Sequence, residues 1–331
     1  MTRSPLAVIE GRTPYFLHHG ECLAWMRTLP DASVDAVVSD LPYAEIDRDY
    51  GRMSEAAWEE FAHALVRESL RVLKPRGSAV YIVQPNSERV GRMRAWCFRF
   101  LAWCADDLVR ETGGRVGLVQ DAWWWNNSAP PTRHCNRAFG LMRPSVKPCV
   151  WVGGADCYRD QQAVLWSESA GNAAARFAGN ELHVPPGGNN MRQRRCASVA
   201  VERGGVTPFN LLPVSGASGA DSAGAYGHGA GTPYDLAAWW VRYLCPKGGV
   251  VLDPCGGTMT MGLAAVRQGR RFLGCEKEAH HFAAGVERMS ACDLDATTPI
   301  AAPSADFGPL FGGASRERVR EALGEMRKNE R

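Results

Sequence analysis

The sequence lacks any apolar run of the roughly 18 residues that a membrane-spanning helix needs. Its first ten residues also lack the apolar core of a signal peptide. From these two absences we expect a cytoplasmic protein with no membrane partner. The length of 331 residues and the hydrophobic content of 45% fit one large α/β domain, or a domain with an insertion.

The cysteine patterns of metal sites are also missing. None of the 11 cysteines forms a Cys-x-x-Cys pair, and no group of Cys and His has zinc-finger spacing. The spacing of Cys97 and Cys104 fits one face of a helix better than a metal site. We therefore predict reduced, buried thiols and no bound metal.

Acidic residues are absent from one long segment. Between positions 122 and 150 the chain carries four basic residues and no Asp or Glu, although the net charge of the whole chain is only +3. Such clusters suit a nucleic-acid backbone, and a solvated basic surface is the alternative. A second basic cluster lies further along the chain. The predicted phosphate contacts are Arg133, Arg137, Arg143, Lys147, Arg192, Arg194 and Arg195.

The apolar pattern of the first half alternates between strands and helices. Residues 34–39 are predicted to form a buried strand that ends at Asp40, and a helix is expected to begin at Ser54. Further strands are predicted at 78–83, 123–125 and 149–152, with a helix over 88–108. This alternation predicts a parallel sheet with helices on both faces.

Residues 250–276 predict a strand, a glycine turn, a helix and a second strand. Glycines in the turn let a ligand approach the backbone closely, because they carry no Cβ. Glu276 ends the second strand about 20 residues after Asp253, where a carboxylate can accept hydrogen bonds from ribose hydroxyls. The segment therefore predicts a nucleoside site, with a glycine turn that binds no ligand as the alternative. A helix with Thr232 as its N-cap is expected just before it.

The stretch Asp40-Leu41-Pro42-Tyr43 follows the first predicted strand. An amine conjugated to an aromatic ring is a poor nucleophile, so a site that makes it react must accept its hydrogen bonds and place it accurately. The Asp40 carboxylate can accept one N–H, and the Leu41 carbonyl, turned by Pro42, can accept the other. The Tyr43 ring offers a stacking surface for a flipped base. A simple turn or N-cap acid is the alternative for Asp40.

These two stretches resemble the motifs of one enzyme family. Asp40-Leu-Pro-Tyr43 resembles the Asp-Pro-Pro-Tyr catalytic loop of the β-class DNA amino-methyltransferases, and residues 253–262 resemble their Asp-Pro-Phe-x-Gly-Ser-Gly cofactor loop. Catalytic loop first and cofactor loop second is the order of this adenine-N6/cytosine-N4 group. The resemblance implies a circularly permuted, Rossmann-like S-adenosylmethionine-dependent methyltransferase fold that acts on double-stranded DNA. It leaves open a cognate restriction nuclease and a homodimer.

The resemblance also implies an organisation and a set of site residues. We expect a catalytic half at 15–155, a loop-rich target-recognition insertion at 156–230, a cofactor half at 231–295 and a peripheral tail at 296–331. The catalytic residues implied are Asp40, Leu41, Pro42 and Tyr43. The cofactor-binding residues implied are Glu21, Cys22, His228, Thr232, Tyr234, Asp253, Pro254, Cys255, Gly256, Gly257, Thr258, Thr260, Glu276 and Lys277.

Three positions depart from the family pattern. Leu41 replaces a proline, Cys255 replaces an aromatic residue and Met259 replaces a glycine. Because Met259 is expected beside the ligand, it predicts weaker or reshaped cofactor binding. A DNA-binding module with a degenerate site is therefore an alternative to an enzyme. Asp at position 40 is commoner in adenine-N6 enzymes and Ser in cytosine-N4 enzymes, so adenine N6 is the favoured target and cytosine N4 the alternative.

Overall fold

The computed structural model describes residues 4–48, 51–132, 135, 137–166, 203, 205, 207–216 and 231–295. The chain divides into two compact units. The first holds the described residues up to Asp160 and from Asn210 onward, and the second holds those between, including the short 3₁₀ helix η2 (Gln162–Val164). The site described below lies wholly in the first unit.

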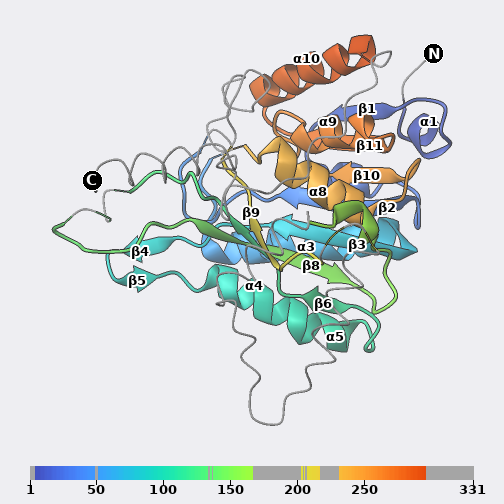
Figure 1. The fold of residues 1–331 in the computed structure, drawn as a ribbon. Helices are drawn as coiled ribbons and strands as arrows, with labels where there is room; N and C mark the ends of the chain where they lie inside the picture. Colours follow the sequence, from blue (N-terminus) through green and yellow to red (C-terminus); the bar gives the residue numbers. More distant parts are fainter. Residues whose placement is uncertain are drawn as a thin grey trace, which may run out of the picture. The chain divides into compact units, whose positions relative to one another are not determined.

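The first unit is built on a sheet with the strand order β1-β11-β10-β2-β3-β8-β7-β9, in which β6 also pairs with β8 (Figure 1). The first five strands of this order are mutually parallel, whereas β8 is antiparallel to β3. The strands are β1 (Tyr15–His19), β2 (Val34–Asp40), β3 (Leu73–Ile82), β6 (Gly117–Gln120), β7 (Trp123–Trp125), β8 (Val146–Gly153), β9 (Leu211–Pro213), β10 (Val250–Asp253) and β11 (Arg271–Glu276).

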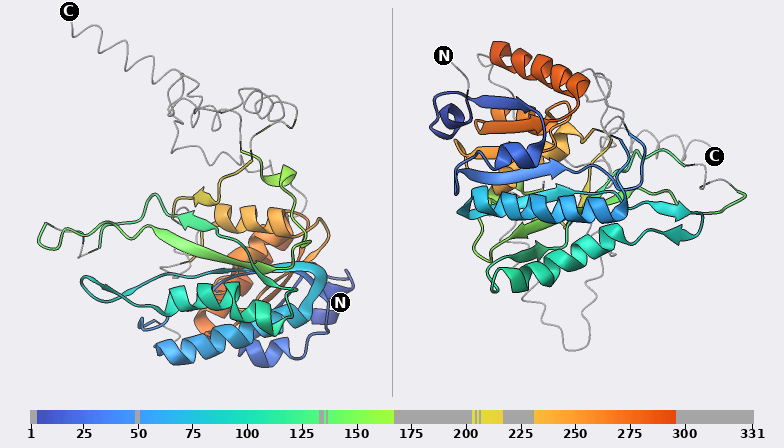
Figure 2. Two further views of the ribbon diagram at one scale, coloured as in Figure 1. Left: turned by 90° about the horizontal axis from the view of Figure 1, so that it is seen from below. Right: turned by 180° about the vertical axis from the view of Figure 1, so that it is seen from behind.

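Helices cover both faces of this sheet. Figure 2 shows α3 (Glu55–Val72) and α4 (Trp96–Ala105) on one side of it and α8 (Tyr234–Leu244) on the other. On the first face, the Trp58 ring packs 4.3 Å from that of Trp96 and 5.3 Å from that of Phe100, centroid to centroid. The remaining helices are α1 (Pro5–Ile9), α2 (Cys22–Met26), α5 (Asp107–Glu111), α9 (Thr260–Arg267) and α10 (Ala279–Asp295), with α9 beside α8. The predicted sheet with helices on both faces is confirmed, and five of its strands are parallel as predicted. The predicted strand at 149–152, which lies in β8, is instead antiparallel to β3 and β7.

Two predictions about helices are wrong. Residues 88–108 do not form one helix, because a small hairpin of β4 (Ser87–Arg89) and β5 (Arg92–Met93) precedes α4. Gly91 lies between these strands with a φ of 76°, a backbone conformation that suits a turn and ends any helix. Thr232 does not cap α8 either, since the N-cap position is Pro233.

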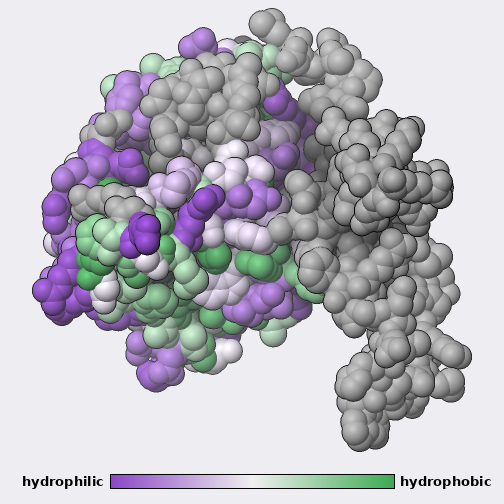
Figure 3. Space-filling view, turned by 60° about the vertical axis from the view of Figure 1, so that its left-hand side comes forward, coloured by the Kyte–Doolittle hydropathy of each residue, from purple (hydrophilic) through white to green (hydrophobic). Residues whose placement is uncertain are grey.

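Polar side chains cover much of the face displayed in Figure 3, and apolar side chains gather in one region of it. Among the residues that the structure describes, no helix is both long and apolar enough to cross a bilayer.

The centre of the sheet is the point where the chain connections diverge. β10 and β2 lie side by side in parallel, with Val251 opposite Ala36 and Leu252 opposite Val37. The chain leaves β10 towards β11 on one side and leaves β2 towards β3 on the other. Ligands of doubly wound sheets bind at the carboxyl ends of the strands at such a point. Asp40 and Asp253 end these two strands.

Asp35 fastens the opposite end of this strand pair. Its Oδ2 accepts a hydrogen bond from the Val250 backbone N–H at 2.8 Å and another from Lys74 Nζ at 2.8 Å. One carboxylate thus joins β2 to the beginning of β10 and to β3. Because both donors are partly buried, their acceptor contributes to the stability of the whole sheet.

We predict that Asp35→Ala lowers the free energy of unfolding by about 1–3 kcal/mol, because it leaves these donors without their acceptor. Urea denaturation measures the change. Asp35→Asn is the matched control, since its amide oxygen can still accept the Val250 N–H, and it is expected to cost less. Equal losses in the two variants would contradict this role of the carboxylate oxygen.

Candidate active site

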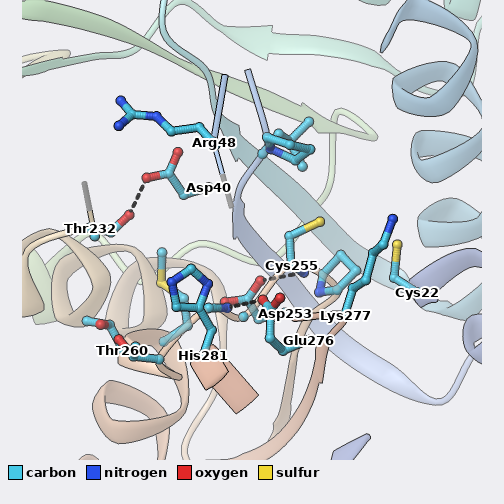
Figure 4. Close-up of a pocket in the computed structure, with 18 of the residues that line it drawn as sticks. Cys22, Asp40, Arg48, Thr232, Asp253, Cys255, Thr260, Glu276, Lys277 and His281 are labelled. Atoms are coloured by element: carbon cyan, nitrogen blue, oxygen red, sulfur yellow. Dashed lines mark hydrogen bonds between the residues drawn. The ribbon is translucent and has the colours of Figure 1, made fainter. Parts of the chain in front are cut away.

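A cavity of about 270 Å³ opens at the carboxyl ends of β2 and β10 (Figure 4), near the lower end of the usual range for small-molecule sites, about 300–1,000 Å³. Figure 4 shows Asp40, Arg48 and Thr232 at one end of it, and Cys22, Glu276 and Lys277 at the other. The predicted site residues that line this cavity are Glu21, Cys22, Asp40, Leu41, Pro42, Tyr43, Thr232, Asp253, Pro254, Cys255, Gly256, Gly257, Thr258, Thr260, Glu276 and Lys277. Residues predicted separately as catalytic and as cofactor-binding therefore share one pocket.

Both carboxylate oxygens of Asp40 accept hydrogen bonds. Thr232 Oγ1 donates to Oδ2 at 2.8 Å, and Tyr43 Oη donates to Oδ1 at 3.0 Å. Burial raises the pKa of Asp40, whereas the Lys147 ammonium and these two hydroxyl donors lower it. The Thr232 hydroxyl, expected to cap a helix, thus orients the carboxylate instead.

The backbone around Leu41 is held from two sides. Leu41 N–H donates to the Ile82 carbonyl at 3.0 Å and so continues the pairing of β2 with β3. The Trp58 indole donates from α3 to the Pro42 carbonyl at 2.5 Å. A proline at position 41 could not make the first of these bonds, because it has no N–H. The departure from the family pattern at Leu41 therefore adds a contact to the loop.

A hydrogen bond joins the two motif stretches directly. Ser39, on β2, donates from Oγ to Asp253 Oδ1 at 2.7 Å, and the Cys255 backbone N–H donates to the same oxygen at 3.1 Å. Only 2% of Asp253 is exposed. Burial raises the pKa of Asp253 to about 7, although these two donors favour its ionised form.

The glycine turn is fixed through Glu276 and Arg288. The Gly257 N–H donates to Glu276 Oε2 at 2.7 Å, and the Glu278 N–H donates to Oε1 at 2.7 Å. Arg288, buried on α10, donates from Nη1 to the Thr258 carbonyl at 2.5 Å and to the Thr258 hydroxyl at 2.8 Å. Sequence reasoning missed Arg288, because nothing along the chain links it to the turn.

The Met259 side chain does not line the cavity, although it was expected beside the ligand, and its predicted effect on cofactor binding stays a prediction. Met259 is fully buried. A Cβ added at Gly256 or Gly274 would lie 2.6 or 2.8 Å from its sulfur, and one at Gly285 would lie 2.6 Å from its Cγ. Three glycines from separate elements thus make room for this side chain. The Met259 backbone itself has a φ of 62°, in the left-handed region.

Cys255 gives the pocket a thiol at a position where the family pattern has an aromatic residue. A hydrogen bond with Cys22 and burial both raise the pKa of the Cys255 thiol. Cys22 and Cys255 both line the pocket, and their small side chains form its wall at position 255, where the family pattern has an aromatic residue.

Several predicted residues lie elsewhere. Tyr234 does not line the pocket, because its ring faces the Arg267 guanidinium at 5.6 Å. Lys147 lies beside Tyr43, and its predicted contact with phosphate stays a prediction. Arg137 and Arg143 are exposed, so their predicted contacts with DNA stay predictions. The residues His228, Arg133, Arg192, Arg194 and Arg195 lie outside the described part of the chain.

Apart from glycines, the cavity is also lined by five residues that sequence reasoning missed, namely Arg48, Met53, Phe61, Met261 and His281. His281 follows β11 by a few positions on the first turns of α10 and is 5% exposed. The position of α10, beginning directly after the strand that Glu276 ends, is the signal that could have indicated it. The other four carry no comparable signal.

Comparison with known proteins decides between the families that share such a pocket. A family model described as DNA methylase matches residues 34–287. The chain belongs to this DNA methylase family. Its members include both adenine-N6 and cytosine-N4 amino-methyltransferases, as predicted from the two motif stretches.

Two curated relatives in this family cover most of the chain. The type II methyltransferase M.PvuII of Proteus hauseri is 24% identical over 291 residues, which are 82% of this chain and 83% of the relative. The DNA adenine methyltransferase YhdJ of Escherichia coli K12 is 23% identical over 282 residues, 82% and 81% of the two chains.

Solved structures of family members share the fold. The cytosine-N4-specific PvuII DNA methyltransferase superposes with a TM-score of 0.63 at 20% identity, covering 86% of this chain and 92% of the other. The M1.HpyAVI–SAM complex gives a TM-score of 0.51 at 16% identity, covering 83% and 98%. The predicted methyltransferase fold class is confirmed.

We predict that Met259→Gly lowers the free energy of unfolding. Loss of a buried Met side chain costs about 2–5 kcal/mol, whereas relief of the left-handed backbone returns about 1–2 kcal/mol. Urea denaturation should show the net loss. Met259→Leu keeps most of the bulk and is expected to cost under about 1.5 kcal/mol. A more stable Met259→Gly variant would show that backbone strain, and not packing, dominates here.

We predict that Asp253→Asn changes the pH dependence of stability. A raised pKa means that folded Asp253 keeps a proton that the unfolded chain has lost, so its contribution falls as pH rises from about 4 to 7. The asparagine variant lacks this loss, so its stability relative to the wild type should improve from pH 5 to pH 8. Urea denaturation at both pH values measures it.

Asp47→Asn is the matched control for this prediction, because it removes a carboxylate whose side chain is 83% exposed. Its stability relative to the wild type should vary much less between pH 5 and pH 8. A constant difference between the wild type and Asp253→Asn would contradict the assignment.

Proposed function

We propose that this chain transfers a methyl group from S-adenosylmethionine to the exocyclic amine of a base flipped out of double-stranded DNA, with adenine N6 as the favoured target. The observation that carries the proposal is the convergence of Asp40 and Asp253 on one pocket in a chain of the DNA methylase family. The Asp40 carboxylate can accept an amine N–H, and Asp253 begins the glycine turn that is typical of a nucleoside site.

The cofactor end of the pocket has chemistry that fits S-adenosylmethionine. Glu276 and Asp253 are acceptors for ribose hydroxyls or an ammonium group, and each carboxylate oxygen can take more than one hydrogen bond. The small thiols of Cys22 and Cys255 leave an apolar wall. The relative M1.HpyAVI was solved as a SAM complex with the same fold, which supports the choice of cofactor.

The catalytic end supplies acceptors and placement. When bound, S-adenosylmethionine would supply a methyl carbon on a sulfonium: the amine nitrogen would take the methyl group, the sulfur would leave as a neutral thioether, and one amine proton would pass to solvent. Asp40 accepts one N–H of the target amine, and the Leu41 carbonyl accepts the other. Tyr43 offers the base a stacking face, which offsets part of the cost of flipping, about a few kcal/mol.

The identity of the target base rests on one side chain. Asp40, as against a serine, supports adenine N6, and the relative YhdJ is a DNA adenine methyltransferase. Cytosine N4 is the second candidate, because the PvuII enzyme, which superposes over 86% of this chain, is cytosine-N4-specific. Both amines present the same N–H groups to Asp40.

Contacts with the DNA backbone are proposed for Arg137 and Arg143. Both are exposed on the connection between β7 and β8, where acidic residues are absent from the sequence. Such residues bind phosphates without reading sequence. A cognate restriction nuclease and a homodimer stay predictions.

Mass spectrometry of nucleosides from DNA of cells that express the chain tests the function. We expect N6-methyladenine with the wild type and at least about 100-fold less with Asp40→Ala. Asp47→Ala, in the same loop but exposed, is the control and should methylate as the wild type does. N4-methylcytosine would overturn the adenine target, and no modified base, in cells or with purified protein and added cofactor, would overturn the enzyme.

A further inference from the structure

Lys147 reaches the catalytic loop from β8. Its Nζ donates to Tyr43 Oη at 3.2 Å, and Tyr43 Oη donates to Asp40 Oδ1 at 3.0 Å. Thr232 donates to the other carboxylate oxygen at 2.8 Å. The carboxylate is thus held between Thr232, just before α8, on one side and β8, by way of the tyrosine, on the other.

Lys147 is partly buried, and its ammonium lies beside two buried aromatic rings. Its ammonium lies 4.6 Å from the ring centroid of Trp124 and 5.4 Å from that of Tyr43. These two side chains are 2% and 4% exposed. A cation desolvated against aromatic faces is held more firmly than one at an open surface.

The charges around this group favour a pair with Asp40. Burial lowers the pKa of Lys147, and the nearby Asp40 carboxylate raises it. The positive charge of Arg48 also lowers it. Asp40 in turn faces Lys147 and Cys149 from β8, Tyr43 from its own loop and Asp253 from β10. Of the groups that lower the pKa of Asp40, Lys147 is the one that carries a positive charge.

The chemistry of the reaction requires what this pair provides. A carboxyl group is the better acceptor for an amine N–H when it is ionised, because protonation turns one of its oxygens into a donor, and it must also be correctly turned. Entry of a base displaces water from the pocket and raises the cost of the ionised form. An ammonium fixed nearby offsets that cost, and a hydroxyl between the two groups sets the direction of the carboxylate.

We propose that Lys147 is a positioning residue for methyl transfer: acting through the Tyr43 hydroxyl, it holds the Asp40 carboxylate in the orientation that accepts an amine N–H. Its charge also keeps that carboxylate ionised when the pocket is closed to water. The inference rests on the proposed function, because it assigns Lys147 a part in the same reaction.

Kinetics of Lys147→Met, Lys147→Arg and Tyr43→Phe test the inference. Lys147→Met should lower kcat at pH 7 by about 10- to 100-fold and move the acid limb of the pH profile up by about one unit. Its KM for DNA should stay within about twofold, because no phosphate contact is lost. Lys147→Arg should recover most of kcat. In the double variant, Tyr43→Phe should add little to Lys147→Met, since both act on one chain of hydrogen bonds.

A second readout does not need activity. The carboxyl carbon of Asp40, followed by NMR in the protein without DNA or cofactor, should titrate at a higher pH in Lys147→Met than in the wild type. If the wild type methylates no DNA, the proposed function fails, while this titration still reports on the pairing. An unmoved titration together with normal methylation overturns the inference alone.

Arg143→Met, from the connection that leads into β8, is the matched control. It is expected to weaken DNA binding and to reduce its dependence on salt, as loss of a phosphate contact does. If Lys147→Met behaves in the same way, with the acid limb and the Asp40 titration unmoved, Lys147 is a DNA contact and the inference is wrong. If Lys147→Met does not fold, Lys147→Arg and Tyr43→Phe carry the same comparison of pH profiles.

Discussion

The parallel pairing of β2 with β10 is the constraint on which the site depends. These strands come from opposite ends of the described chain, yet their carboxyl ends meet at the centre of the sheet. The Ser39–Asp253 hydrogen bond then locks one loop to the other. Because strand ends are rigid compared with free loops, the two carboxylates keep a fixed separation, and placement of this kind supplies much of the rate in group transfer.

Much of this arrangement could be predicted from the sequence, for reasons that differ between elements. The strands that end at Asp40 and Asp253 are short apolar runs, and the turn after the second is marked by glycines, so local patterns suffice. The family order of the two motifs supplied their relation in space. The hairpin before α4 was missed because its strands are exposed and polar and carry no apolar alternation.

The side chains that were misplaced share one property: their partners are distant in the chain. Thr232 looked like a helix cap, yet its hydroxyl serves a carboxylate on another strand. Met259 looked like an obstacle to the cofactor, yet glycines from the turn, β11 and α10 accommodate it. Lys147 looked like part of a basic surface, yet it lies between buried rings. Residue type and spacing do not contain this information, because it arises only when the elements pack.

The edge of the sheet has a consequence for how such folds diversify. β1, near the amino end, is hydrogen-bonded in parallel to β11, and α10 after β11 packs against both. The beginning and the end of the described methyltransferase core are therefore neighbours, and a short connection from α10 to β1 would close the chain into a ring. Opening that ring ahead of β10 would place the cofactor loop first without moving any strand. The order of the two loops along the chain thus depends on where the termini lie in this ring. The geometry of the pocket does not depend on it.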